Sequence, residues 1–310
     1  MKNKSDDYGD IDLRKIFSFL FVNKILISLF TFFFLSLSVL YASLLHNTYK
    51  SESVIMPVTD NNSSLNSLGS LVSNFGGLAN FTGMNLPNTA QSKTNEIIAV
   101  MSSYDFFEQL MLKNDFTIEL MAGYGWDEEN NEVMIDERIY DVDEEKWLVE
   151  NYNQKLDKPT MQSTFKVFKQ IFEVKYDSDS SFIIVSVEHF SPVFAKNLLD
   201  DIIFLTNKIF VDKVISEGEQ SISYLTERYE ETKLAEIRST LSNLIQIQTQ
   251  KVALANSSSE SIFKIISSPI IPEEKAGPSR MIIIILGFLI GLFMGIIFSF
   301  VKGIVKSSNK

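Results

Sequence analysis

The sequence predicts an α+β fold, with a large acidic domain between two transmembrane helices. Two uncharged apolar runs, 25–45 and 281–301, lie near opposite ends of the 310-residue chain. Each run has 21 residues, about 31 Å as a helix, which is enough to cross a hydrocarbon core of about 30 Å. The segment between them mixes strand-like and helix-like patterns and contains one long helical stripe.

The charge distribution predicts the orientation of the two spans. The tails 1–24 and 302–310 carry eight Lys or Arg residues against four Asp residues, whereas 46–280 has 20 bases and 35 acids, a net charge of −15. Lys and Arg beside a span are retained on the cytoplasmic side, and long loops cross largely regardless of charge. We therefore expect both tails in the cytoplasm and 46–280 outside. The alternative for 25–45 is a signal peptide, but the run exceeds an h-region and has no clear small-x-small cleavage site.

The composition excludes several kinds of site. The chain has no cysteine, so it has no disulfide, thiolate metal site or cysteine nucleophile. A strongly acidic central domain argues against nucleic acid as a partner.

The first half of the central domain shows one strand pattern, one helix pattern and two loop-like stretches. Residues 51–58 read as a short strand, and 94–112 have helical apolar spacing with a break near Ser102 and Ser103. The stretch 60–92 is rich in Gly, Asn and Ser, but it lacks the Gly-Lys-Ser/Thr of a P-loop, so we expect a flexible or partner-packed loop. The acidic stretch 126–147 lacks the spacing of a calcium loop, so we expect a solvated, partly irregular surface.

The second half predicts a strand followed by a very long helical stripe. The β-branched run 182–187 reads as a strand. Ser191 and Pro192 follow as N-cap and first helical residue, and apolar residues then recur at helical spacing to about Asn256, with a pause near Gly218. A continuous helix of that length would measure roughly 95 Å, so it must project or fold back as a hairpin. Residues 262–266 read as a returning strand.

The segment before the second span carries the family resemblance. Pro269, Pro272 and Pro278 keep a three-residue register, with Lys275 in the remaining place. Proline at this spacing favours a stiff polyproline-II segment. Gly287, Gly291 and Gly295 share one face of the second span and favour close helix packing; the packing partner is left open between the first span, another copy and another membrane protein.

These features resemble the bacterial polysaccharide chain-length determinant (Wzz-type) family, the polysaccharide co-polymerases. Further resemblance lies in 185–189 before the Ser191 helix start, in 221–227, in 236–241 and in 263–266. It covers most of the chain and is weakest over 113–165.

The resemblance implies a fold and a function. The fold is a membrane-proximal mixed α/β base with a long projecting helix or helical hairpin, assembled as a ring in the periplasm. The function is control of the modal length of a surface polysaccharide, foremost lipopolysaccharide O-antigen, from the bacterial inner membrane. The implied partners are further copies of the chain, the polymerase, the growing lipid-linked glycan and membrane lipid.

No catalytic, cofactor-binding or metal-binding residue is expected. The two histidines, His46 and His189, are far apart in sequence and read as structural or solvated, and no G-x-S-x-G or H-E-x-x-H motif occurs. The alternative function is a periplasmic adaptor for capsule or exopolysaccharide export. A chemoreceptor would need an output domain after the second span, and a tyrosine kinase would need a Walker motif; we expect neither.

Overall fold

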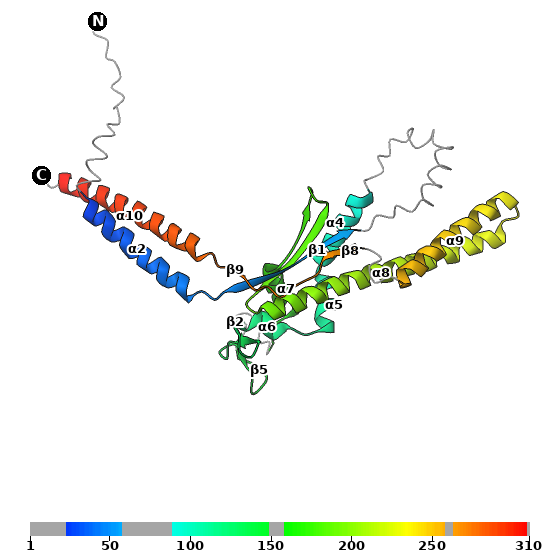
Figure 1. Ribbon diagram of the computed structural model, residues 1–310, viewed down its shortest axis with the longest axis horizontal. Helices are drawn as coiled ribbons and strands as arrows, with labels where there is room; N and C mark the ends of the chain where they lie inside the picture. The colour runs from blue at the N-terminus through cyan, green and yellow to red at the C-terminus, as the bar shows by residue number, and fades with distance from the viewer. Residues whose placement is uncertain (1–22, 58–88, 149–157, 258–262, 309–310) are drawn as a thin grey trace, which may run out of the picture. The chain divides into compact units, whose positions relative to one another are not determined.

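The computed structural model describes residues 23–57, 89–148, 158–257 and 263–308. The chain is of the α+β class, as expected, and divides into two units: residues 48–275, and residues 1–47 together with 276–310. The elements in chain order are α2 (Lys24–Leu44), β1 (Thr48–Pro57), α4 (Thr89–Met101), α5 (Tyr104–Lys113), α6 (Thr117–Met121), β2 (Gly123–Asp127), β3 (Glu132–Ile135), β4 (Tyr140–Asp141), β5 (Lys146–Trp147), α7 (Met161–Ile171), β6 (Phe172–Asp177), β7 (Phe182–His189), α8 (Pro192–Glu231), α9 (Ala235–Ser257), β8 (Phe263–Ser267), β9 (Lys275–Gly277) and α10 (Arg280–Ser308) (Figure 1).

The larger unit is built on an antiparallel sheet with strand order β6-β7-β1-β8. The expected strands at 51–58, 182–187 and 262–266 are present as β1, β7 and β8. Val185 is the centre of one sheet face, because it lies opposite Val174 on β6 and Ser53 on β1. Val185 and Ser53 are fully buried, so this face of the sheet carries the core.

Helices α4, α5, α7 and the first half of α8 complete that core. The expected break in 94–112 is confirmed: α4 ends at Met101, and Ser103 caps α5 by accepting from the backbone N–H of Phe106. Phe107, Phe168 and Phe172 form a chain of ring contacts across α5, α7 and β6. Such aromatic pairs add to the stabilisation from area burial alone.

The acidic stretch forms two short hairpins, β2–β3 and β4–β5, which the sequence reading missed. Its aspartates act as turn residues: Asp127 accepts from the backbone N–H groups of Glu129 and Asn130, and Asp141 accepts from those of Asp143 and Glu144. Acidic side chains are therefore used here for turn chemistry.

The long helical stripe folds back as a hairpin. α8 has 40 residues, about 60 Å, and it ends at Glu231; α9 returns along it (Figure 1). The expected pause near Gly218 is wrong, because α8 continues through Gly218 and the chain turns instead at 232–234. Gly218 is buried where the helices pack, and a Cβ at that position would lie 2.3 Å from Cγ2 of Val252.

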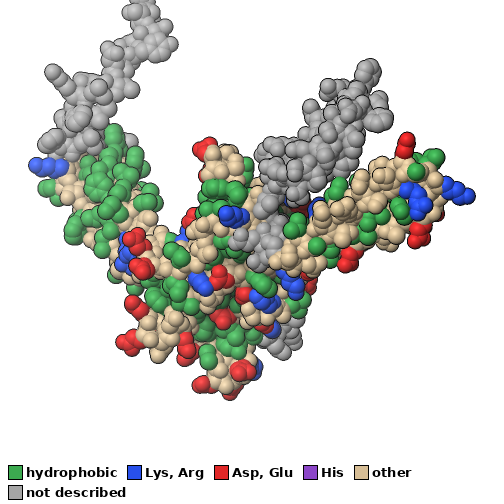
Figure 2. Space-filling view, turned by 45° about the vertical axis from the view of Figure 1, so that its right-hand side comes forward, with side chains coloured by type: hydrophobic (Ala, Val, Ile, Leu, Met, Phe, Trp, Pro, Cys, Tyr) green, Lys and Arg blue, Asp and Glu red, His purple; other side chains and the backbone are tan. Residues whose placement is uncertain are grey.

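The smaller unit is a pair of apolar helices, α2 and α10, packed side by side. Both are long and apolar enough to cross a membrane. Figure 2 shows the outer surface of this pair as largely hydrophobic, and most of its large apolar side chains are exposed. That surface suits a lipid environment. Most of the Gly/Asn/Ser-rich stretch 60–92 lies outside the described residues.

Candidate functional site

The glycine stripe of α10 lies against α2 of the same chain. A Cβ built on Gly287 would lie 2.4 Å from Cβ of Ser38, one on Gly291 would lie 2.8 Å from Cα of Thr31, and one on Gly295 would lie 2.9 Å from Cα of Ile27. The contacts run in opposite directions along the two helices, so the pair is antiparallel. Of the three packing partners left open by the sequence, the structure places the first span against all three glycines.

The α2 side of this contact is also made of small residues or backbone. Thr31 and Ser38 turn their hydroxyl groups back to carbonyl groups of their own helix, those of Ile27 and Leu35, both at 2.9 Å. Ala42 is buried as well. The hydroxyl groups are thus hydrogen-bonded within α2, and the two helices can approach until their backbones are in contact.

Ser299 extends the stripe beyond the predicted glycines. It is fully buried, and its Oγ has no hydrogen-bond partner among the described residues. Its place four residues after Gly295 is the same register, so the spacing of small residues was the signal that could have revealed it. The sequence reading stopped at glycine and missed it.

The three prolines are divided between the two units. Pro269 is buried beside β8, in a stretch held to β1 by hydrogen bonds from Ser53 Oγ to the carbonyl of Ser267 (2.7 Å) and from Ser51 Oγ to that of Ile270 (2.8 Å). Pro272 follows in the same unit, whereas Pro278 belongs to the helix-pair unit. Residues 268–274 form neither helix nor strand, so the stretch is held by side-chain hydrogen bonds to β1.

His189 is a buried structural residue at the start of α8. Its Nδ1 accepts from the backbone N–H of Ser191 at 3.2 Å, and its Nε2 lies 3.3 Å from the carbonyl oxygen of Glu119. Burial lowers the pKa of His189 to about 4, so the ring is neutral at pH 7. The neighbouring Glu119 is mostly buried, and its burial raises its pKa. His46 is exposed, after α2, and belongs to the helix-pair unit, whereas His189 belongs to the larger unit.

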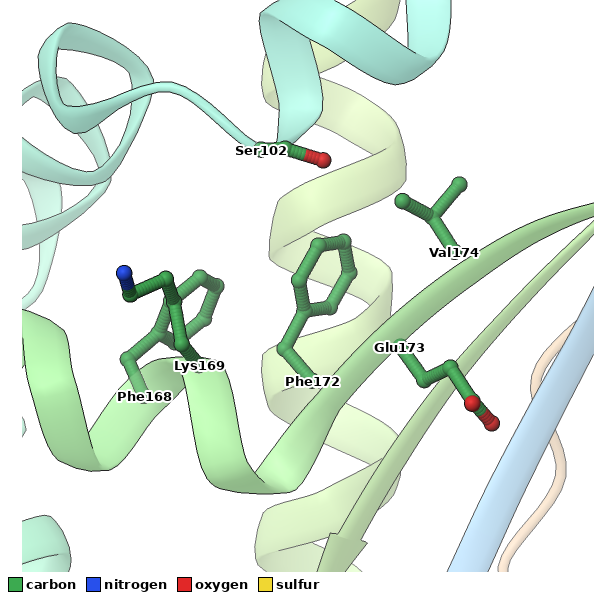
Figure 3. Close-up of a pocket in the computed structure, with 6 residues that line it drawn as sticks. All are labelled: Ser102, Phe168, Lys169, Phe172, Glu173 and Val174. Atoms are coloured by element: carbon green, nitrogen blue, oxygen red, sulfur yellow. The ribbon is translucent and has the colours of Figure 1, made fainter.

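One hollow opens beside the edge strand β6. It has a volume of about 260 Å³ and is lined by Ser102, Phe168, Lys169, Phe172, Glu173 and Val174. Figure 3 shows the side chains of Phe172 and Val174 on the side of Ser102, with Glu173 pointing away. The lining is mainly apolar, and the volume is below the range typical of small-molecule sites. Among the described residues, no group of three or more His, Asp or Glu side chains could hold a metal.

The comparisons with known proteins bear on the family. Residues 9–120, a little over a third of the chain, match the family model of the Wzz chain length determinant protein. No curated protein matches the chain. Among solved structures, the chain is similar to a full-length bacterial polysaccharide co-polymerase, with 12% identity, 97% of this chain and 99% of that one covered, and a TM-score of 0.37. It is also similar to a fragment of WzzB, the polysaccharide co-polymerase from Salmonella Typhimurium, with 10% identity, 74% and 100% covered, and a TM-score of 0.33.

Both TM-scores are low, so only the match to the family model bears on the family. A domain of this class, followed by a helical hairpin and flanked by two apolar helices, is the architecture expected from the resemblance. Residues 9–120 match the model of the same Wzz-type family that the sequence resembles, and this match supports the resemblance.

Proposed function

We propose that this protein is an inner-membrane polysaccharide co-polymerase that oligomerises and regulates the modal chain length of a surface polysaccharide. The observation that carries the proposal is the family match over 9–120, which includes the first apolar helix and the start of the central domain. The two apolar helices at the ends of the chain fit an inner-membrane protein with two spans. The polysaccharide that we propose is lipopolysaccharide O-antigen, and the partner is the polymerase that extends it.

In this proposal the central domain is periplasmic and both tails are cytoplasmic. The protein acts as a regulator, and we assign no catalytic residue. The glycine stripe holds the two spans together, and the proline segment sets the approach of the chain to the second span. The second half of α8 and most of α9 lie outside the core, with Tyr224, Leu234, Ile237 and Leu254 exposed. We propose that this surface contacts further copies of the chain.

The test is a gel of lipopolysaccharide from the source strain with the gene deleted, beside the same strain complemented. Length control predicts that the deletion spreads the O-antigen bands evenly and that complementation restores a cluster. An adaptor for capsule or exopolysaccharide export predicts a different result from the same deletion. The band cluster would stay intact, and less polysaccharide would reach the surface. Intact clustering and intact surface polysaccharide in the deletion would contradict both functions.

A further inference from the structure

Arg280 lies at one end of the helix pair and makes no ion pair among the described residues. It is the first residue of α10, and its side chain is only partly exposed. Its Nη2 donates to Oδ1 of Asn47, just after α2, at 3.1 Å, and its Nε is buried without a hydrogen-bond partner among the described residues. A guanidinium withdrawn from water needs an anionic partner to offset the lost hydration.

The part of the helix-pair unit that the structure describes offers no such partner. Its described residues, 23–47 and 276–308, contain no Asp or Glu. Across the described part of the chain, no ion pair involves Arg280. The amide of Asn47 orients the guanidinium but brings no charge. Among the described residues, then, no carboxylate balances Arg280, and its charge is open to an anion from outside the chain.

The local helix ends do not supply the missing negative charge. Because α2 and α10 are antiparallel, the C-terminus of α2 and the N-terminus of α10 lie at the same end, and their partial charges oppose each other. Ile282 and Ile283 donate to the carbonyl of Ser279, so the two preceding backbone N–H groups have no acceptor within the helix. These N–H groups point toward the same end as Arg280 and suit a phosphate.

The position of Arg280 selects the kind of anion. The residues that follow it, 281–301, are uncharged and mostly apolar, and so are residues 25–45, which include most of α2. A residue at this boundary lies at the depth of lipid headgroups, where the available anions are phosphates. A basic residue at the outer end of a span also runs against the usual charge bias, which calls for a local reason.

We propose that Arg280, oriented by Asn47, binds the phosphate or diphosphate group of a membrane lipid at the outer face of the helix pair. The inference rests on the proposed function in one respect, the topology that puts Arg280 at the outer face. Two lipids carry this chemistry there: a bulk phospholipid, and the polyprenyl diphosphate on which a glycan is built. Arginine matches phosphate with two parallel hydrogen bonds, which an amide or a single ammonium group cannot reproduce.

Lipid binding to the purified full-length protein tests the site. Native mass spectrometry would count adducts with dioleoyl phosphatidylglycerol, with undecaprenyl diphosphate and with dioleoylglycerol, which has no phosphate. Arg280→Gln should weaken binding of a phosphate lipid by about tenfold, and Arg280→Lys by less, because the charge remains without the fork. Lys302→Gln, which removes one exposed charge at the other end of the same span, is the matched control and should leave that binding unchanged.

The outcomes distinguish the two lipid sources, and they distinguish failure of the lipid site from failure of the proposed function. Equal binding of both phosphate lipids indicates a bulk headgroup, and preference for the diphosphate indicates the glycan carrier; either supports the site. Equal adducts with dioleoylglycerol, unchanged binding in Arg280→Gln, or an equal loss in Lys302→Gln would overturn it. The proposed function fails separately, on the lipopolysaccharide gel, and lipid counts do not depend on that result.

Discussion

At the scale of single residues, His189 ties the start of α8 to α6 and makes stability depend on pH. Its folded pKa of about 4 lies below the ordinary value near 6.5. The unfolded chain therefore binds a proton on this ring more readily than the folded chain does. The stabilisation that the neutral ring contributes to folding is complete above pH 6.5, and it is lost as the pH falls toward 4. The loss is at most about 3 kcal/mol. His189→Gln should flatten this part of the profile, measured as denaturant unfolding of the detergent-solubilised protein at pH 7 and pH 5.

Glu119 provides the control of opposite sign. Its pKa is raised by burial, so its contribution is complete below pH 4.5 and is lost as the pH rises through the folded pKa. Its Oε2 is buried without a hydrogen-bond partner among the described residues. Glu119→Gln should therefore raise stability at pH 7 and steepen the fall toward pH 5. A His189→Gln profile as steep as that of the natural chain would contradict this account.

At the scale of elements, Gly218 sets the distance between the two arms of the hairpin. A Cβ there would lie 2.3 Å from Cγ2 of Val252, so a side chain at 218 must push α9 away. Gly218→Val should destabilise the hairpin by about 1–3 kcal/mol, measured as earlier proteolytic cleavage of α9. Val252→Ala alone costs less, and combining it with Gly218→Val should restore part of the resistance. Cleavage of the double variant at the rate of Gly218→Val would show that the contact is not the cause.

In the helix pair, the size of the side chain at position 291 sets how closely α2 and α10 can pack. At Gly291 an added Cβ would meet backbone, Cα of Thr31 at 2.8 Å, which cannot rotate away. Gly291→Ala should therefore shift the modal length of the polysaccharide and Gly291→Leu should abolish the clustering, read on the lipopolysaccharide gel. Leu289→Phe adds bulk at an exposed position of the same helix and should be tolerated. Equal effects at 289 and 291 would remove helix packing as the explanation.

These elements show what the sequence could predict. The break at Ser103, the cap at Ser191 and the strand 182–187 follow from local propensity, and the structure has all three. The turn at 232–234 has no glycine or proline to mark it, so periodicity suggested a pause at Gly218 instead. Gly218 is there for contact with Val252, which lies 34 positions later. Likewise Arg280 is oriented by its hydrogen bond to Asn47. The two residues are far apart in the sequence, so no local pattern predicts this contact.

At the scale of the whole molecule, charge separates the central domain from the tails. Residues 46–280 carry a net charge of −15, whereas the tails carry an excess of bases. The positive-inside rule then predicts cytoplasmic tails and a periplasmic centre. Because the chain has no cysteine, single cysteines can report this directly. Ser239→Cys lies at an exposed position on α9, and Ser307→Cys lies near the end of α10.

A membrane-impermeant maleimide should label Ser239→Cys in cells whose outer membrane alone has been permeabilised. Ser307→Cys should react only after the inner membrane is broken, because the lipid bilayer separates it from the reagent. The natural chain, which has no thiol, controls for labelling of other groups. Labelling of Ser307→Cys before lysis would show that the second span is reversed or does not cross the membrane. If the orientation is reversed, Arg280 and the central domain both lie at the inner face, and the outer-face lipid site proposed for Arg280 is contradicted.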